Sequence, residues 1–139
     1  AYDVTLLPGT YNLGWRGPAA ACATTQLPCN AAPLQGNVML TADGVLDLDA
    51  RAVRVRGAVT LNGAALPEST LRGALRFQGP SPEQGAVDVA LPSSGAGAYA
   101  VTLIAGAYTA LHSGALACDA TRPSTVPCGA QALAGCTTP

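Results

Sequence analysis

Few side chains in this chain could carry acid–base or nucleophilic chemistry. His112 is the only histidine, so catalysis of the Ser/His/Asp type would need it as the base. It ends an alternating apolar stretch beside Ser113-Gly114, and no motif selects a pair of carboxylates for glycoside hydrolysis. All seven basic residues are arginine, which excludes lysine Schiff bases and lysine isopeptide crosslinks. We expect a protein that is not an enzyme and uses no cofactor.

The only acidic cluster is formed by Asp43, Asp47 and Asp49. In a strand Asp47 and Asp49 would share a face, with Asp43 across a turn, which makes the three a weak candidate for Ca²⁺. Their spacing differs from that of an EF-hand loop. The favoured alternative is that Asp43 shapes a hairpin while the other two face water. Zinc is not expected, because the single histidine lies far from any cysteine pair with metal-ligand spacing.

Five cysteines supply the only crosslinks open to the chain. Cys22 and Cys29 form one close pair and Cys118 and Cys128 another, and each pair ends in Pro-Cys. Neither has CxxC spacing, so we expect local disulfides that pin long loops in a secreted or cell-surface protein. Cys136 is left over and is a candidate for an intermolecular disulfide or a partner outside this chain. Pairing of Cys136 with Cys128, in place of Cys118, is an open alternative.

Residues 2–11 recur without gaps at residues 99–108. Tyrosine, valine, threonine, leucine, glycine and tyrosine match in that order. The similarity continues past Gly17 and Gly114 to both cysteine pairs, and it fades near Leu34 and Leu133. A repeat of this length indicates a whole domain per unit. We call residues 2–34 the first copy and residues 99–133 the second copy.

The repeat is out of phase with the chain, and this sets the expected domains. Residues 1–37 are the C-terminal part of a preceding repeat unit, which packs on or completes the next one. Residues 38–139 are one module. An incomplete unit leaves an open sheet edge, and a strand from a neighbour can fill such an edge.

Alternation of apolar and polar residues predicts short strands joined by turns. Turn dipeptides stand at Pro8-Gly9, Asp43-Gly44 and Asn62-Gly63. The expected strands are residues 2–7, 11–15, 38–41, 45–48, 52–61, 71–78, 87–91, 98–104 and 107–111. Together they predict an all-β, antiparallel β-sandwich of the transthyretin-like or immunoglobulin-like kind, rich in alanine and glycine.

One predicted strand carries arginines against an apolar face. In residues 71–78, Leu71, Leu75 and Phe77 alternate with Arg72 and Arg76. Alternation would place these apolar residues, together with Gly73, on one face of the strand and both arginines on the other.

Four rings are candidates for a ligand surface. Tyr11, Trp15, Tyr108 and His112 could stack against a sugar, because aromatic faces with a polar rim bind carbohydrate. The tyrosines recur in register, however, which fits cross-strand packing at least as well. His112 corresponds to Trp15 in the repeat, and a position that accepts either ring is expected at an exposed edge.

Charge and hydropathy exclude other partners. The net charge of −1 gives no reason to expect nucleic acid or an anionic membrane surface. No apolar run is long enough for a membrane span, so no membrane insertion is expected.

Residues 55–108 resemble the carboxypeptidase-regulatory-like, or transthyretin-like, β-sandwich family. The resemblance rests on the glycine-containing, valine-rich strand and turn at 55–67, the Gly-Ala-Tyr strand at 97–101 and the Ala-Gly-Ala-Tyr at 105–108. Residues 7–11 match the ending of this family more closely still, whereas the cysteine-bearing loops depart from its pattern. The chain also resembles alanine-rich tandem modules on surface proteins of GC-rich, myxobacteria-like bacteria. This resemblance implies a spacer, stalk or binding platform without catalysis.

The expected function is that of an extracellular structural or adhesive repeat. Such a module would assemble end to end with copies of itself or with neighbouring repeats, as a filament or stalk subunit. The alternative is a carbohydrate-binding module of a secreted protein, with polysaccharide as its partner.

Overall fold

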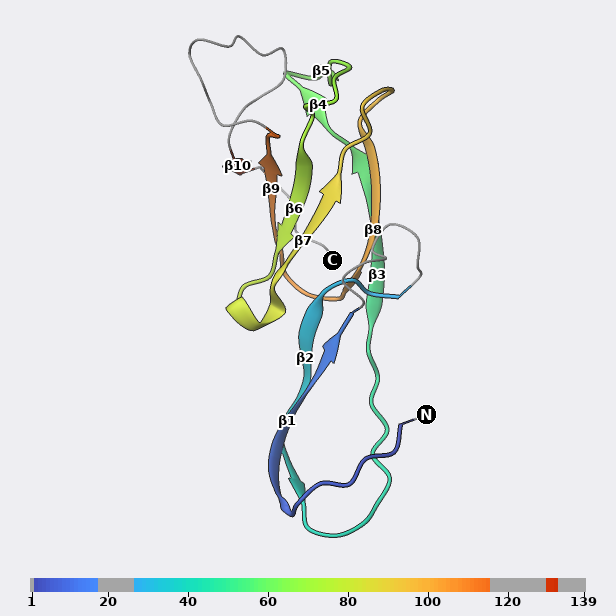
Figure 1. The fold of residues 1–139 in the computed structure, drawn as a ribbon, viewed down its shortest axis with the longest axis vertical. Helices are drawn as coiled ribbons and strands as arrows, with labels where there is room; N and C mark the ends of the chain where they lie inside the picture. The colour runs from blue at the N-terminus through green and yellow to red at the C-terminus, as the bar shows by residue number, and fades with distance from the viewer. Residues whose placement is uncertain (1, 18–26, 116–129, 133–139) are drawn as a thin grey trace.

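The computed structural model describes residues 2–17, 27–115 and 130–132, and they form an all-β protein. Within these described residues the only helical element is a short 3₁₀ turn, η1 (Pro82–Gln84). The strands, labelled in Figure 1, are β1 (Gly9–Arg16), β2 (Ala31–Leu40), β3 (Ala52–Ala58), β4 (Thr60–Leu61), β5 (Ala64–Ala65), β6 (Ala74–Gln78), β7 (Ala86–Ala90), β8 (Ala98–Ile104), β9 (Thr109–Ser113) and β10 (Ala130–Ala132).

Two antiparallel sheets make the sandwich, which confirms the predicted fold class. One sheet has the strand order β10-β9-β6-β7, and β3 and β8 pair to form the other. The apolar side chains of the two sheets alternate inward, as the period of two requires. The ring centroids of Phe77 on β6 and Tyr99 on β8 lie 6.0 Å apart across the core. The other buried core residues are Cys29, Val59, Leu66, Leu75, Val87, Leu91, Val101, Leu103 and Ala110.

β1 and β2 form a separate antiparallel pair, which lies end to end with the sandwich along the long axis of the molecule (Figure 1). The register of this pair shifts between Tyr11 and Gly14. Residues 41–51 leave the end of β2 without forming a strand and lead into β3.

The two copies of the repeat pair their strands in the same register. In the first copy Trp15 of β1 lies opposite Ala32 of β2. In the second copy His112 of β9 lies opposite Gln131 of β10. Ala32 and Gln131 hold the same place after their Pro-Cys dipeptides, so the strand pairing agrees with the sequence alignment.

The Asn62-Gly63 turn is confirmed. Asn62 and Gly63 have φ of 52° and 79°, and Leu61 pairs with Ala64 on either side of them. Two consecutive residues with positive φ are the requirement of the two-residue hairpin turn that favours Asn-Gly.

Three other predictions are wrong in whole or in part. The hairpin around Asp43-Gly44 does not form, because residues 31–40 pair with β1 instead of folding back on residues 45–48. Residues 2–7 run without strand structure, since they have no ladder partner among the described residues. A strand without such a partner leaves its main-chain groups to water. The long strand expected at 52–61 is also interrupted, and Val59 separates β3 from β4.

The expected alternation fails at Leu71 and Arg72 as well. Arg72 is only 1% exposed, whereas Leu71 is 37% exposed. Gly73 follows with φ of 76°, in the left-handed region, and this breaks the alternation before β6 begins. A Cβ at Gly73 would lie 2.0 Å from the main-chain oxygen of Ser113, so only glycine fits there. Beyond this kink the prediction is confirmed: Leu75 and Phe77 are buried and Arg76 is exposed.

Candidate interaction surface

A buried asparagine joins the β1–β2 pair to the sandwich. Asn30 precedes β2 and is 3% exposed. Its Nδ2 donates to the Tyr108 hydroxyl at 2.7 Å, and its Oδ1 accepts from the Ile104 amide at 2.8 Å. Beside it, the Cys29 amide donates to the carbonyl of Thr102 at 3.0 Å. One carboxamide thus satisfies both a side chain and a main-chain amide of the other unit, and we call this contact the junction.

Tyr108 shapes the sandwich side of the junction. Its hydroxyl donates to the carbonyl of Ile104 at 2.7 Å, which closes the corner between β8 and β9. Burial raises the pKa of Tyr108, and the hydrogen bond from Asn30 works in the opposite direction to a smaller extent. The phenol therefore stays neutral at ordinary pH.

The first copy contains the same corner in an exposed setting. The Tyr11 hydroxyl donates to the carbonyl of Leu7, at the positions that correspond to Tyr108 and Ile104. Gly9 lies under the Tyr11 ring just as Gly106 lies under that of Tyr108. The corner that holds Asn30 at the junction is thus also present at the start of β1, at the end of the β1–β2 pair that lies away from the sandwich (Figure 1).

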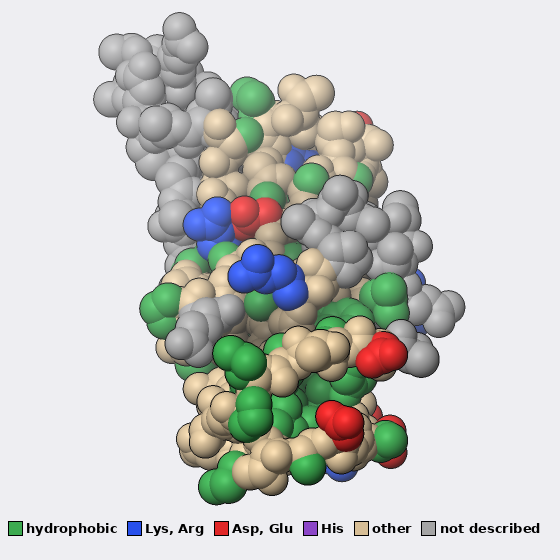
Figure 2. Space-filling view, turned by 60° about the horizontal axis from the view of Figure 1, so that its bottom comes forward, with side chains coloured by type: hydrophobic (Ala, Val, Ile, Leu, Met, Phe, Trp, Pro, Cys, Tyr) green, Lys and Arg blue, Asp and Glu red, His purple; other side chains and the backbone are tan. Residues whose placement is uncertain are grey.

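The residues leading into the exposed corner are apolar. Figure 2, turned toward that end of the molecule, shows apolar side chains over much of it. Leu7 is 81% exposed and Val4 is 62% exposed, whereas their counterparts Ile104 and Val101 are 6% and 2% exposed. Large exposed apolar patches on water-facing surfaces commonly mark interaction sites. The exposed corner and the apolar residues that lead into it are therefore a candidate interaction surface. It was found by comparing the exposure of equivalent residues in the two copies of the repeat.

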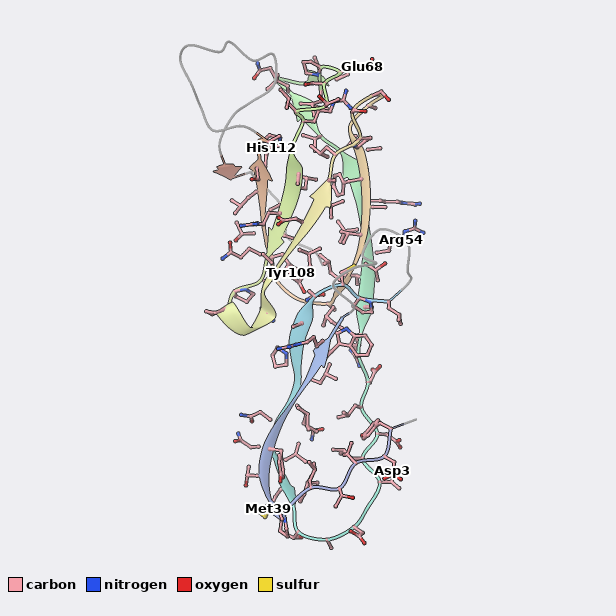
Figure 3. The ribbon with its side chains drawn as sticks, viewed as in Figure 1. Asp3, Met39, Arg54, Glu68, Tyr108 and His112 are labelled. Carbon is pink, nitrogen blue, oxygen red and sulfur yellow. The ribbon has the colours of Figure 1, made fainter. Side chains whose placement is uncertain are left out.

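The four aromatic candidates do not form one exposed face. His112 is 4% exposed, and its Nε2 donates to the main-chain oxygen of Arg72 at 2.8 Å. The expected exposed edge at this position is therefore wrong. Trp15 is half-buried and donates from Nε1 to the carbonyl of Pro28 at 3.2 Å. Figure 3 shows Tyr108 and His112 at opposite ends of β9, and Tyr11 lies in the β1–β2 pair. Each of the four rings makes a hydrogen bond to a main-chain oxygen of its own chain, and the four do not share one exposed face.

The three aspartates lie on the exposed stretch between β2 and β3. Asp49 accepts from Nε of Arg51 at 3.3 Å, and both side chains are exposed. Within the described parts of the chain, no three His, Cys, Asp or Glu side chains gather closely enough to hold a metal ion. The structure thus gives the Ca²⁺ candidate Asp43, Asp47 and Asp49 no common site.

Of the cysteines, only Cys29 falls within the described residues, and it is 7% exposed at the junction. The remaining four, Cys22, Cys118, Cys128 and Cys136, lie outside them. The two local disulfides and the intermolecular role of Cys136 stay predictions.

Arg72 is a buried structural residue that the alternation pattern did not predict. Its guanidinium donates from Nε to Pro67 O at 2.7 Å, and its two terminal nitrogens donate to four further carbonyls. These acceptors are Pro92 O (2.7 Å) and Ser94 O (3.0 Å) for Nη1, and Leu66 O (2.7 Å) and Gly95 O (2.9 Å) for Nη2. All five N–H groups of the guanidinium are satisfied, which lets the charge be buried. Arg72 thus connects the loop before β6 to the loop after β7. The one feature of the sequence that could have indicated its buried position is Gly73, directly after it.

An ion pair lies on the outer face of the β10-β9-β6-β7 sheet. Arg76 and Asp88 lie opposite each other on β6 and β7 and form a two-pronged pair, with both N–O distances 2.8 Å. The hydrogen bond from Arg76 lowers the pKa of Asp88, and partial burial works against it. Both side chains are about half exposed, so water screens the pair.

No protein-family model, no curated protein and no solved structure matches the chain. In the described residues no helix is long and apolar enough to span a membrane.

Proposed function

We propose that the chain is an extracellular structural or adhesive module that assembles end to end with like modules into a fibre or stalk. The junction carries this proposal. Through Asn30, Tyr108 and Ile104 the end of one copy's strand pair contacts the corner of the next copy's sandwich. The chain therefore already contains one end-to-end contact between two related units.

Because the corner is repeated, a neighbouring chain could make a similar contact at its second occurrence. The corner that receives Asn30 recurs as the exposed corner of Leu7 and Tyr11. An assembly that repeats the junction would place the far end of another module on this corner. In the sequence Gly129 stands where Asn30 would recur, so that contact would rely on main-chain groups and apolar packing.

The cysteines suggest the cellular compartment in which such an assembly would form. Two short-range cysteine pairs fit an oxidising compartment, as in secreted and cell-surface proteins. A structural role also fits the described part of the chain, in which the buried polar residues Asn30, Arg72 and His112 all bind main-chain groups of their own chain.

Sedimentation of the full chain over a range of concentrations tests the proposal, with negative-stain microscopy of the same samples. Concentration-dependent oligomers, and fibres with a regular axial repeat, are expected. Gels run with and without reductant would show whether Cys136 links the chains. A strictly monomeric chain at the highest attainable concentration would overturn the proposal.

A pair of matched variants identifies the end that is used. Leu7→Asp places a charge beside the exposed corner and should suppress the oligomers. Arg54→Asp likewise introduces an aspartate, at an exposed side chain on β3 of the sandwich and away from that corner (Figure 3). It should leave assembly intact, and equal loss in both variants would argue against docking at the corner.

A further inference from the structure

β1 has one edge that pairs with no strand in the described parts of the chain. Its other edge pairs with β2. Tyr2 and Val4 are both 62% exposed and Leu6 is 48% exposed on the neighbouring segment. We call the open edge of β1 together with these three side chains the acceptor surface.

The second copy shows what covers the equivalent surface. There β9 pairs with β10 on one edge and with β6 on the other. In that ladder Leu75 lies opposite His112 and Phe77 opposite Ala110. The corresponding β1 residues are Trp15 and Leu13, so the edge filled by β6 in the second copy is the edge left open in the first.

β6, together with β7, also covers the apolar face of the second copy. Tyr99, Val101 and Leu103 are the counterparts of Tyr2, Val4 and Leu6. Val101 and Leu103 are 2% and 0% exposed because β6 and β7 lie over them, and the Phe77 ring lies against that of Tyr99. The β6–β7 hairpin, residues 74–90, thus supplies both the missing ladder and the missing apolar layer.

We propose that the acceptor surface binds a hairpin of the β6–β7 kind from a like module. Identifying the partner as a like module rests on the proposed function, whereas the open surface itself does not. The donor would pair its β6 with the edge of β1 and place its leucine and phenylalanine over Val4 and Tyr2.

The chemistry of the hairpin suits this role. Leu75, Phe77 and Val87 point into the core, 1%, 3% and 5% exposed, while the Arg76–Asp88 pair lies on the outer face. Docking would therefore bury apolar side chains and complete main-chain hydrogen bonds without burying a charge. Strand addition draws its affinity from such main-chain bonds and its specificity from alternate side chains.

The test extends the full chain with a donor in the order found in the second copy. Residue 98 corresponds to Ala1, so a copy of residues 74–97 is placed directly ahead of Ala1. A short tether gives the donor a high effective concentration at the acceptor surface. Hydrogen exchange is then followed at the β1 amides that do not bond to β2 and at Val4. We expect exchange there to slow at least roughly tenfold relative to the unextended chain.

The matched control has the same length and the same tether. It carries Leu75→Asp and Phe77→Asp in the added copy only, and its β1 amides should exchange as in the unextended chain. Unchanged β8 amides show in each protein that the resident sandwich is folded. No slowing with the intact donor, or equal slowing with the control, would overturn the proposal.

A second variant protects the test against a donor that disturbs folding. Val4→Asp changes an exposed residue, so the unextended chain should keep its stability. In the extended chain the same change should abolish the slowing of exchange, and persistent slowing would show that the donor binds elsewhere.

The result separates this inference from the proposed function. Protected β1 amides in the extended chain, together with a strictly monomeric unextended chain, would uphold the acceptor surface and reject assembly between chains. Assembly of the unextended chain without any donor-dependent protection would uphold assembly and reject the acceptor surface.

Discussion

The two copies share a sequence pattern and a strand register but differ in burial. Val4 is 62% exposed and Val101 is 2% exposed, although each is the second residue after its tyrosine. The corner hydrogen bonds from Tyr11 to Leu7 and from Tyr108 to Ile104 are the same in both. What differs is the layer above: β6 and β7 cover the second copy, and no described strand covers the first.

The comparison separates local from tertiary causes of structure. A corner and a two-strand register need only neighbouring residues, so the repeated sequence reproduces them. Burial needs a second sheet, and hydrophobic stabilisation follows the apolar area removed from water. The same valine should therefore matter greatly in one copy and little in the other.

The largest effect is expected at Arg72, which anchors the loops next to β6 and β7, the layer that covers only the second copy. Arg72→Leu leaves five loop carbonyls without their donor and should cost about 3–5 kcal/mol of stability. Arg76→Leu, on the exposed face of β6, is the control and should have little effect. Urea unfolding measures both, and comparable losses would mean that Arg72 is not the fastening of these loops.

Truncation of matched leucines tests the burial contrast directly. Leu103→Ala opens a cavity in the core and should cost about 2–5 kcal/mol. Leu6→Ala, at the equivalent position of the first copy, should change stability by less than about 0.5 kcal/mol. Thermal unfolding at fixed protein concentration compares them, and a large loss for Leu6→Ala would show that the first copy is already covered.

The two corner tyrosines sharpen the comparison through pH. Tyr108→Phe removes the bonds to Ile104 and Asn30 and should cost about 1–2 kcal/mol, more than Tyr11→Phe. Because the folded-state pKa of Tyr108 is raised above 10.0, this phenol stabilises the fold below that pH. The contribution is lost as pH rises through the folded-state pKa. Unfolding measured from pH 8 upward should show a shallower alkaline loss in Tyr108→Phe, and an unchanged profile would contradict this assignment.

The smallest effect concerns the outer face of the donor-type hairpin. Arg76 lowers the pKa of Asp88 below 3.8, so the pair stabilises the fold above that value. Its contribution is lost as pH falls through the folded-state pKa. Asp88→Asn should lower Tm by less than about 3 °C near neutral pH, since the pair is screened, and should flatten the acid branch. A larger loss would point to a role beyond this pair.

Alternation predicted most of the sandwich because each strand keeps one face in the core. Leu75, Phe77, Val101 and Leu103 all lie where the period of two places them. The pattern failed at Arg72, where the positive φ of Gly73 turns the chain before the strand starts. No periodicity reports a backbone kink of this kind.

The other failures have tertiary causes. Asp43-Gly44 is a good hairpin signal, yet no hairpin forms there because β2 pairs with β1 instead of with residues 45–48. Residues 2–7 have the composition of a strand, but composition supplies no partner edge. The candidate surface itself was predictable in outline, because a repeat out of phase implies an incomplete unit. Its residues were not, since exposure depends on which layer is missing.

The junction also has a mechanical consequence. The strands run nearly along the long axis, so tension applied at the ends loads the β1–β2 and β3–β8 ladders in shear (Figure 1). The two units are held at the junction by contacts around Asn30 and Cys29, and the chain crosses between them on residues 41–51, which form no ladder. A stalk built from such modules would bend and yield at its junctions first, while each sandwich kept its shape under load.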